Sequence, residues 1–179
     1  MLLRIALLLL VLAVVPVRGE PTVSGQVLKV LPHYLDAKGR TSTAPSLYER
    51  DAYQAQLRAN PALRSGMEFA VKWRATAPKD TPLKLRLELR GGRPGQLPTR
   101  ATMEQTLTPG GGLFGIWTPF RLEGVLARHL GDVNSWRATL WQGEKLLSEQ
   151  KSFLWAPDPV VVATGTNSPS VSPSGSTAK

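Results

Sequence analysis

The chain has 179 residues, of which 42% are hydrophobic and 20% are charged, an ordinary balance for a globular protein. This balance excludes a fibrous chain, a wholly disordered chain and a multi-pass membrane protein, and the lack of cysteine excludes a disulfide framework, a thiolate metal cluster and a cysteine nucleophile. The formal net charge is +9, and without the two arginines of residues 1–19 it is +7, which still favours anionic partners.

Residues 1–19 have the three parts of a secretory signal peptide. Arg4 precedes an unbroken apolar run, and Val17 and Gly19 lie three residues and one residue before the predicted cut. The alternative is a retained membrane anchor, but the apolar run is too short to cross roughly 30 Å of hydrocarbon comfortably. We therefore predict export to the periplasm or the exterior, and no stable transmembrane span after cleavage.

The other end of the chain, residues 158–179, is predicted to be a disordered tail rich in Ser, Thr and Pro. From Thr164 onward it carries too few apolar side chains to offset the entropy of ordering the backbone. One domain, residues 20–157, is left to fold. A single chain segment of this length is enough for one hydrophobic core.

The first expected elements of that domain are a strand over 22–34 and a helix over 46–58. A proline near the end of the strand places it at a sheet edge, since proline cannot donate to a central ladder. Ser46 and Glu49 have the spacing of a capping box at the helix start, and Asn60 precedes the proline that ends the helix. The stripe expected to pack against another element is at helical spacing: Tyr48, Ala52, Ala55 and Ala59.

Beyond residue 66 the apolar residues recur at every second position, which is typical of strands with one buried and one solvated face. Gly143 provides the positive φ of a closing hairpin turn. The expected strands span 67–75, 83–90, 100–107, 116–122 (broken by Pro119), 136–141 and 145–155, with a helical turn over 125–130.

This pattern predicts a mainly β domain: an antiparallel two-sheet sandwich, immunoglobulin-like, with one inserted helix near residues 46–58. The strands over 67–75 and 83–90 and the hairpin over 136–155 resemble the immunoglobulin or fibronectin-III type of sandwich found in exported bacterial proteins. The resemblance implies the fold and carries over no catalytic or binding residues. The alternative fold is a small β-barrel with one packed helix.

The sequence indicates a protein that is not an enzyme and that has no cofactor and no metal site. The two histidines, His33 and His129, are not accompanied by a Gly-x-Ser-x-Gly turn or by a recognisable metal-binding motif. Glu68 and Glu88 lie on charged strand faces, where cross-strand ion pairs explain them better than paired catalytic carboxylates. No nucleic-acid-binding pattern accompanies the basic charge, so we expect no nucleic-acid partner.

Two features are candidate partner or ligand surfaces. Leu113 and Phe114 lie between glycines, either exposed to a partner's groove or a membrane interface, or folded back over one end of the sandwich. Trp117 and Trp141 are expected opposite the core, either as a carbohydrate-stacking surface or as cover for a neighbouring element. The favoured function is an exported interaction or structural module at the cell envelope, whose partner is an unknown envelope protein or an anionic polymer. The alternatives are a carbohydrate- or anionic-polymer-binding module and, third, an unrecognised hydrolase.

Overall fold

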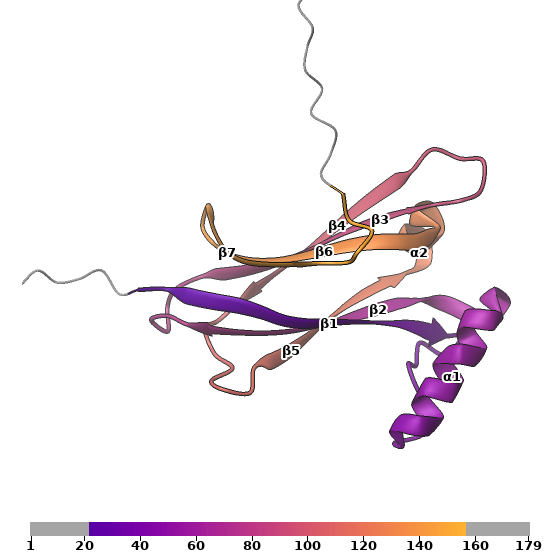
Figure 1. The fold of residues 1–179 in the computed structure, drawn as a ribbon, viewed down its shortest axis with the longest axis horizontal. Coiled ribbons are helices and arrows are strands. Elements are labelled where there is room, and N and C mark those ends of the chain that lie inside the picture. Colours follow the sequence, from indigo (N-terminus) through magenta and orange to yellow (C-terminus); the bar gives the residue numbers. More distant parts are fainter. Residues whose placement is uncertain (1–21, 157–179) are drawn as a thin grey trace, which may run out of the picture.

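Residues 22–156 are described by a computed structural model, so the predicted signal peptide and tail lie outside the described residues. The described chain is built of two stacked sheets with both α-helices at one end (Figure 1). The elements in chain order are β1 (Ser24–Asp36), α1 (Leu47–Ala59), the 3₁₀ turn η1 (Pro61–Leu63), β2 (Arg64–Thr76), β3 (Leu83–Gly92), β4 (Thr99–Leu107), β5 (Ile116–Glu123), α2 (Gly124–Leu130), β6 (Asp132–Gln142) and β7 (Lys145–Lys151).

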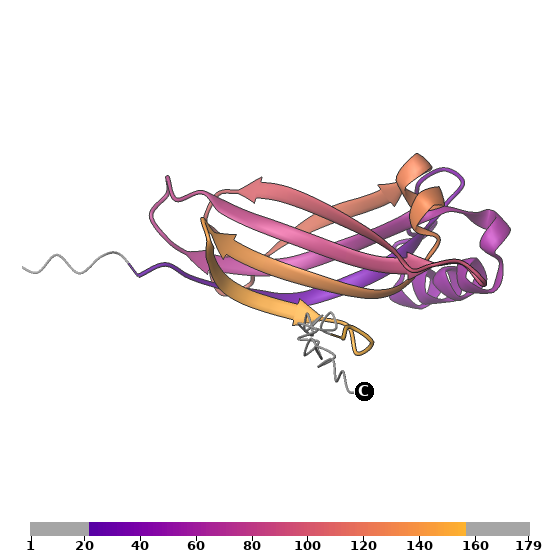
Figure 2. The same cartoon turned by 90° about the horizontal axis from the view of Figure 1, so that it is seen from above.

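The strands form a three-stranded sheet, in the order β1-β2-β5, and a four-stranded sheet, in the order β4-β3-β6-β7. Every pair of neighbouring strands is antiparallel. Figure 2 shows the strands of both layers running along the long axis of the molecule. The prediction of a two-sheet antiparallel sandwich is therefore confirmed, and the strands do not form the single closed sheet of the barrel alternative.

The core lies between the two sheets and follows the predicted alternation. In β3 every second residue is buried from Leu83 to Leu89, and in β2 the same holds from Phe69 to Ala75. Each such side chain contributes about 1.5–3 kcal/mol when it leaves water. Trp73 is the largest fully buried side chain, and its indole N–H donates to the hydroxyl of Thr118 at 2.8 Å.

The solvated faces carry the predicted cross-strand ion pairs. Glu68 on β2 lies opposite Arg121 on β5 in the register, with 3.0 Å between carboxylate and guanidinium. Glu88 on β3 lies opposite Arg137 on β6, at 2.6 Å. Both carboxylates therefore form cross-strand ion pairs on the sheet surface, as predicted from the sequence.

The predicted helix is present, but its expected cap and its expected packing stripe are wrong. The Ser46 side chain makes no capping hydrogen bond. The stripe that begins at Tyr48 and Ala52 is exposed, and the buried residues are Gln54 and Leu57. Because the helix covers only one end of β1, only a narrow stripe of the helix is buried. The amide of Gln54 occupies part of this stripe because the Tyr34 backbone groups of β1 need hydrogen-bond partners there.

Two strand boundaries also differ from the predictions. Pro119 does not break β5, because β5 is an edge strand and proline needs no ladder donor on its outer side. The second arm of the hairpin ends at Lys151, earlier than the predicted Trp155. The helical turn expected over 125–130 is confirmed as α2, and Gly143 has the expected positive φ of 54°.

Candidate interaction surface

Of the two candidate surfaces that the sequence singled out, the more exposed is the loop between β4 and β5, at the end of the sandwich away from the helices (Figure 1). Leu113 and Phe114 are each 84% exposed on this loop, and we call this pair the apolar tip. The folded-back arrangement weighed from the sequence is therefore wrong. The β4–β5 loop projects below the three-stranded sheet in Figure 1, and no element of residues 22–156 covers the two side chains.

The glycines of this loop hold it against β2. The carbonyl of Gly110 accepts the Ala75 N–H at 2.9 Å, and the Gly115 N–H donates to the Gly111 carbonyl. Gly115 has φ 74°, and a Cβ at this position would lie 2.9 Å from the Trp73 carbonyl oxygen. Only glycine allows this close approach to β2, so the loop presents the apolar tip from an anchored base.

Basic side chains lie beside the base of this loop, on the outer face of the three-stranded sheet. Trp117, Lys72 and Lys29 are successive partners across β5, β2 and β1. Trp117 is 43% exposed, and the Lys72 ammonium lies 5.6 Å from the centre of its ring. Arg74 follows on the same face and donates to Gln26 at 3.0 Å. Among residues 22–156, no ion pair joins an acid to Lys29, Lys72 or Arg74, which we call the basic patch.

Trp141 lies on the outer face of the other sheet. It is the register partner of Lys84, the guanidinium of Arg86 lies 5.5 Å from its ring centre, and its indole N–H donates to Thr139. Trp117 and Trp141 therefore occupy opposite sides of the sandwich and do not form one stacking platform. The structure adds Trp155, whose ring lies 4.0 Å from the Arg90 guanidinium on the same face as Trp141.

The early end of β7 explains why the sequence missed Trp155. The Ser152 N–H makes a last backbone bond to the Trp136 carbonyl, and a turn closed by the Trp155 N–H to the Ser152 carbonyl follows. Trp155 therefore lies in this turn instead of on a strand. The only sequence signal for Trp155 was that an aromatic residue stands at the end of the predicted strand over 145–155.

A hollow of about 510 Å³ lies at the helix end of the sandwich, and the sequence did not predict it. Arg64, Arg93 and Arg128 line it, and two of these guanidinium groups bond to the protein itself: Arg93 donates to the Arg128 carbonyl, and Arg64 is held at the end of α1. Arg64 donates to the carbonyls of Leu57 and Arg58 at the end of α1 and lies over the Tyr34 ring at 4.1 Å. Arg64 in this hollow therefore connects the end of α1 to the sandwich.

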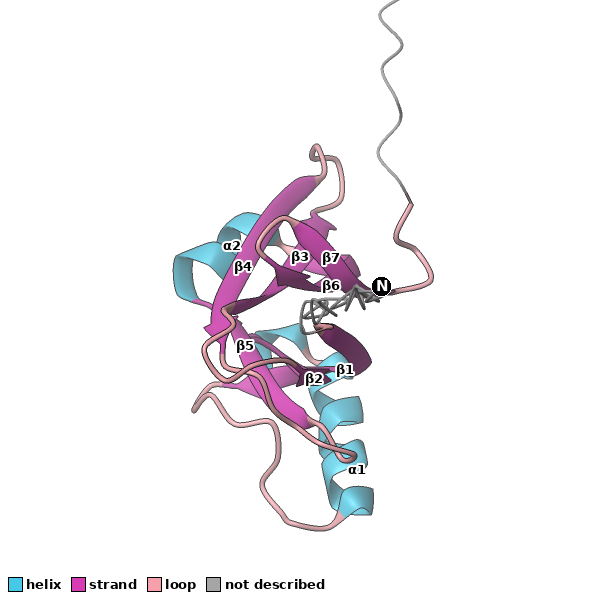
Figure 3. Cartoon of the chain, turned by 90° about the vertical axis from the view of Figure 1, so that its left-hand side faces the viewer, coloured by secondary structure: helices cyan, strands magenta, loops and turns pink. Residues whose placement is uncertain are grey.

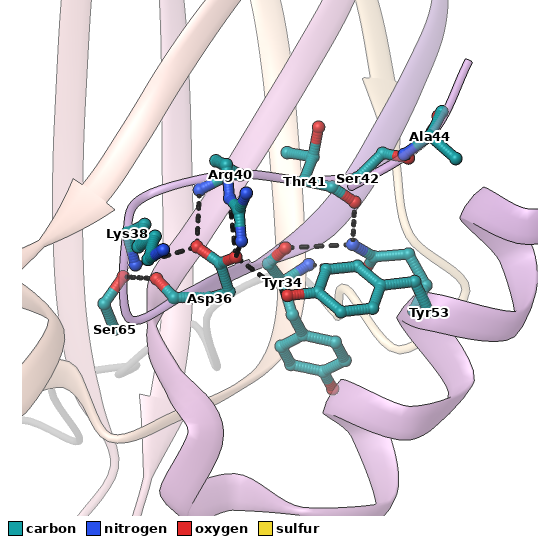
Figure 4. Close-up of polar contacts among 10 residues, drawn as sticks. Tyr34, Asp36, Lys38, Arg40, Thr41, Ser42, Ala44, Tyr53 and Ser65 are labelled. Atoms are coloured by element: carbon teal, nitrogen blue, oxygen red, sulfur yellow. Dashed lines mark hydrogen bonds and ion pairs between the residues drawn. The ribbon is translucent and has the colours of Figure 1, made fainter.

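The turn after β1 contains the most connected polar group in the described chain, the carboxylate of Asp36 (Figure 4). It accepts hydrogen bonds from the backbone N–H groups of Lys38 and Arg40, from the Arg40 guanidinium and from the Tyr53 hydroxyl, all at 2.8–2.9 Å. These donors, the Arg40 N–H first, hold the pKa of Asp36 far below its usual range. The hydrogen bond that the Tyr53 hydroxyl donates to the Asp36 carboxylate in turn raises the pKa of Tyr53. The backbone carbonyl of Asp36 also accepts from Ser65.

The neighbouring residue of α1, Gln54, satisfies the exposed edge of β1. Its amide accepts from the Tyr34 N–H at 2.7 Å and donates to the Tyr34 carbonyl at 2.9 Å, as a partner strand would. Further along this edge, the Val27 N–H donates to the Ser148 hydroxyl of β7 at 3.0 Å. These bonds reduce the unpaired backbone of β1, which weighs against addition of a partner strand at this edge.

The histidines lie apart from each other. His129 is exposed on α2, and His33 is half-buried on β1, where burial and then the nearby charge of Arg50 lower its pKa. Asp36, three residues from His33, is occupied by the turn. Within residues 22–156, no group of three or more His, Cys, Asp or Glu side chains is arranged to hold a metal ion.

No family model, curated protein or solved structure matches the chain significantly. Within the described residues, no helix has both the length and the apolar character needed to span a bilayer.

Proposed function

We propose that this protein is an exported, non-catalytic sandwich that acts as an interaction module at the cell envelope and docks through the apolar tip. The observation that carries the proposal is the exposure of two adjacent large apolar side chains, Leu113 and Phe114, on a loop anchored by glycines. Exposed apolar side chains that stand together mark interaction sites more often than isolated ones do. The signal-like pattern of residues 1–19 supports the cell envelope as the location.

The strand order supports the resemblance to immunoglobulin and fibronectin-III sandwiches as part of the proposal. Seven antiparallel strands divided into three and four are typical of that class. The fourth strand pairs with the third, in the arrangement expected of the fibronectin-III variant. Such sandwiches serve as scaffolds for many surfaces, so the fold is compatible with an interaction role and does not specify the partner.

Replacing both tip residues by serine is the test of this function. The Leu113→Ser/Phe114→Ser double variant is expected to lose roughly tenfold or more of its retention in the envelope fraction of its own cells, because burial of two such side chains in a partner is lost. Its melting temperature should stay unchanged, since both side chains are exposed in the free protein.

The matched control is Leu97→Ser, since Leu97 is 86% exposed on the β3–β4 loop at the helix end of the molecule. It should retain wild-type association. Equal retention of the double variant and the wild type would overturn the proposed function.

The second candidate function is binding of an anionic polymer, and it is favoured by the outer face of the four-stranded sheet. Trp141 and Trp155 each lie against an arginine on this face. We expect Trp141→Ala to weaken retention on an acidic-polysaccharide column by about two- to tenfold, the usual worth of an aromatic contact. Trp117→Ala, on the opposite face, is the control. Equal retention of the Trp141 variant and the wild type excludes this candidate.

A further inference from the structure

We infer that the partner of the apolar tip is the surface of an anionic phospholipid bilayer, an inference that rests on the proposed function and names its partner. The apolar tip would enter the boundary between headgroups and acyl chains, and the basic patch would contact the headgroup phosphates. Three features of the described residues lead to this assignment.

The first feature is the composition around the tip. Leu113 and Phe114 are almost fully exposed, and Trp117, three residues after Phe114 at the start of β5, is half exposed. Tryptophan is enriched at membrane interfaces because its ring is apolar and its N–H is polar. Trp, Phe and Leu side chains accompanied by basic residues are the composition of segments that insert shallowly at a bilayer surface.

The second feature is charge. The basic patch, Lys29, Lys72 and Arg74, lies on β1 and β2 beside the base of the loop, and a Cβ on Gly115 would lie 3.4 Å from the Lys72 side chain. The ion pairs of this face begin further along β2, at Glu68 and Arg121. Cations that have no acidic partner among the described residues, next to an apolar insertion point, favour an anionic lipid surface. Each basic residue near such a surface is expected to raise affinity about fivefold.

The third feature is a second apolar projection on the same side of the molecule. Figures 1 and 3 show α1 below β1 and β2, on the side to which the β4–β5 loop also projects. Leu47 and Tyr48 are exposed at the first turn of α1. The two elements lie towards opposite ends of β2, which with its 13 residues spans roughly 40 Å.

A flat, extended partner contacts both projections together, whereas a groove in a partner protein takes only one. Glu49 and Asp51 accompany the projection on α1, so anionic headgroups favour the loop end, where the basic patch lies. We therefore assign the bilayer as the partner and the apolar tip as the main point of insertion.

The test is sedimentation of the mature protein with vesicles of phosphatidylethanolamine and phosphatidylglycerol, compared with vesicles of phosphatidylcholine alone. We expect binding to the anionic vesicles that weakens with added salt, and little binding to phosphatidylcholine. The Leu113→Ser/Phe114→Ser variant should lose about tenfold or more in affinity for the anionic vesicles, while Leu97→Ser should bind as the wild type does.

Charge is tested by a second pair of variants. Lys29→Gln/Lys72→Gln should weaken binding to the anionic vesicles by about 25-fold, from fivefold for each lysine. The control, Lys38→Gln, removes a charge from the exposed turn after β1, at the helix end of the sandwich. Equal binding of wild type and tip variant, or absence of binding by the wild type, overturns the bilayer assignment.

Different outcomes contradict the bilayer assignment and the proposed function. If the tip substitutions abolish envelope retention but the wild type does not bind anionic vesicles, the bilayer assignment is wrong and the tip binds an envelope protein. If envelope retention survives the tip substitutions, the proposed function itself is wrong. Binding to anionic vesicles together with tip-dependent envelope retention supports both.

Discussion

Replacing Trp73 by alanine is expected to destabilise the protein by about 3–5 kcal/mol, the cost of deleting a large aromatic side chain from a core. Trp73 lies on the central strand of the three-stranded sheet and is 2% exposed. Its removal leaves a cavity between the sheets and leaves the Thr118 hydroxyl without its indole donor. Because small domains are stable by only about 5–15 kcal/mol, this loss should appear as a large fall in the urea midpoint.

Two further substitutions separate the causes of that loss. Trp73→Phe keeps most of the apolar contact and removes the hydrogen bond to Thr118, so it should cost about 1–3 kcal/mol. Trp117→Ala removes a tryptophan of the same sheet whose ring is half exposed, and should cost under about 1 kcal/mol. If Trp73→Ala were no more destabilising than Trp117→Ala, the two-sheet core described above would be wrong.

Replacing Asp36 by alanine is the second large expected effect. The substitution removes the acceptor of four hydrogen bonds in the turn between β1 and α1, and it leaves the N–H groups of Lys38 and Arg40 and the Tyr53 hydroxyl without their partner. We expect a clear fall in melting temperature, larger than that caused by Tyr53→Phe, which removes only one of the four bonds. Amide hydrogen exchange should also accelerate in residues 38–40, because this turn loses its central acceptor.

The effect of Asp36 is expected to depend on pH with a definite sign. Its pKa in the folded protein lies below the usual value of about 3.9 for an unfolded chain. The stabilisation is therefore fully present above about pH 5, where both states are ionised, and shrinks as the pH falls below about 4, where only the unfolded state takes up the proton. Urea unfolding of wild type and Asp36→Asn at several pH values measures the difference.

The comparison of variants isolates Asp36 from the other groups that titrate in acid. His33 and Glu104 also have lowered pKa values, and they destabilise the wild type and the variant alike as the pH falls. A difference in unfolding free energy that stays constant from pH 7 to pH 3 would contradict the role given to the Asp36 carboxylate.

The strands were predictable because alternation is a local property of the chain. A residue two positions from Leu85 points to the same side of β3 whatever the rest of the protein does, so apolar and charged residues at alternate positions already define the buried and solvated faces. The pairs of Glu68 with Arg121 and of Glu88 with Arg137 were anticipated only as a class, because the register that brings them together depends on strands far apart in the chain.

The helix was predictable in extent but not in its buried face. A proline after Asn60 stops any helix locally, and α1 ends at Ala59, one residue beyond the predicted end at 58. The face that is buried depends on what the helix contacts, and α1 contacts β1, whose unpaired Tyr34 backbone selects Gln54. The hydrophobic pattern of the helix could not predict this, because it does not show that the Tyr34 backbone needs a side-chain amide as its partner.

The candidate surface was predictable as a set of residues and not as a surface. Leu113 and Phe114 between glycines were an evident feature of the sequence, but their exposure depends on the docking of Gly110 and Gly115 against β2. Trp117 and Trp141 were both expected to point away from the core, and only the sheet order places them on opposite sides of the molecule.

The sequence by itself determined the class of fold, the strands and the residues that fill the core, because these follow from short-range periodicity and from the free energy of burying apolar side chains. The tertiary structure decided which cations lie beside the apolar tip, which face of α1 is buried and which acceptor holds the turn at Asp36. Those arrangements join residues distant in the chain, and their energies arise from contacts that exist only after the two sheets have packed.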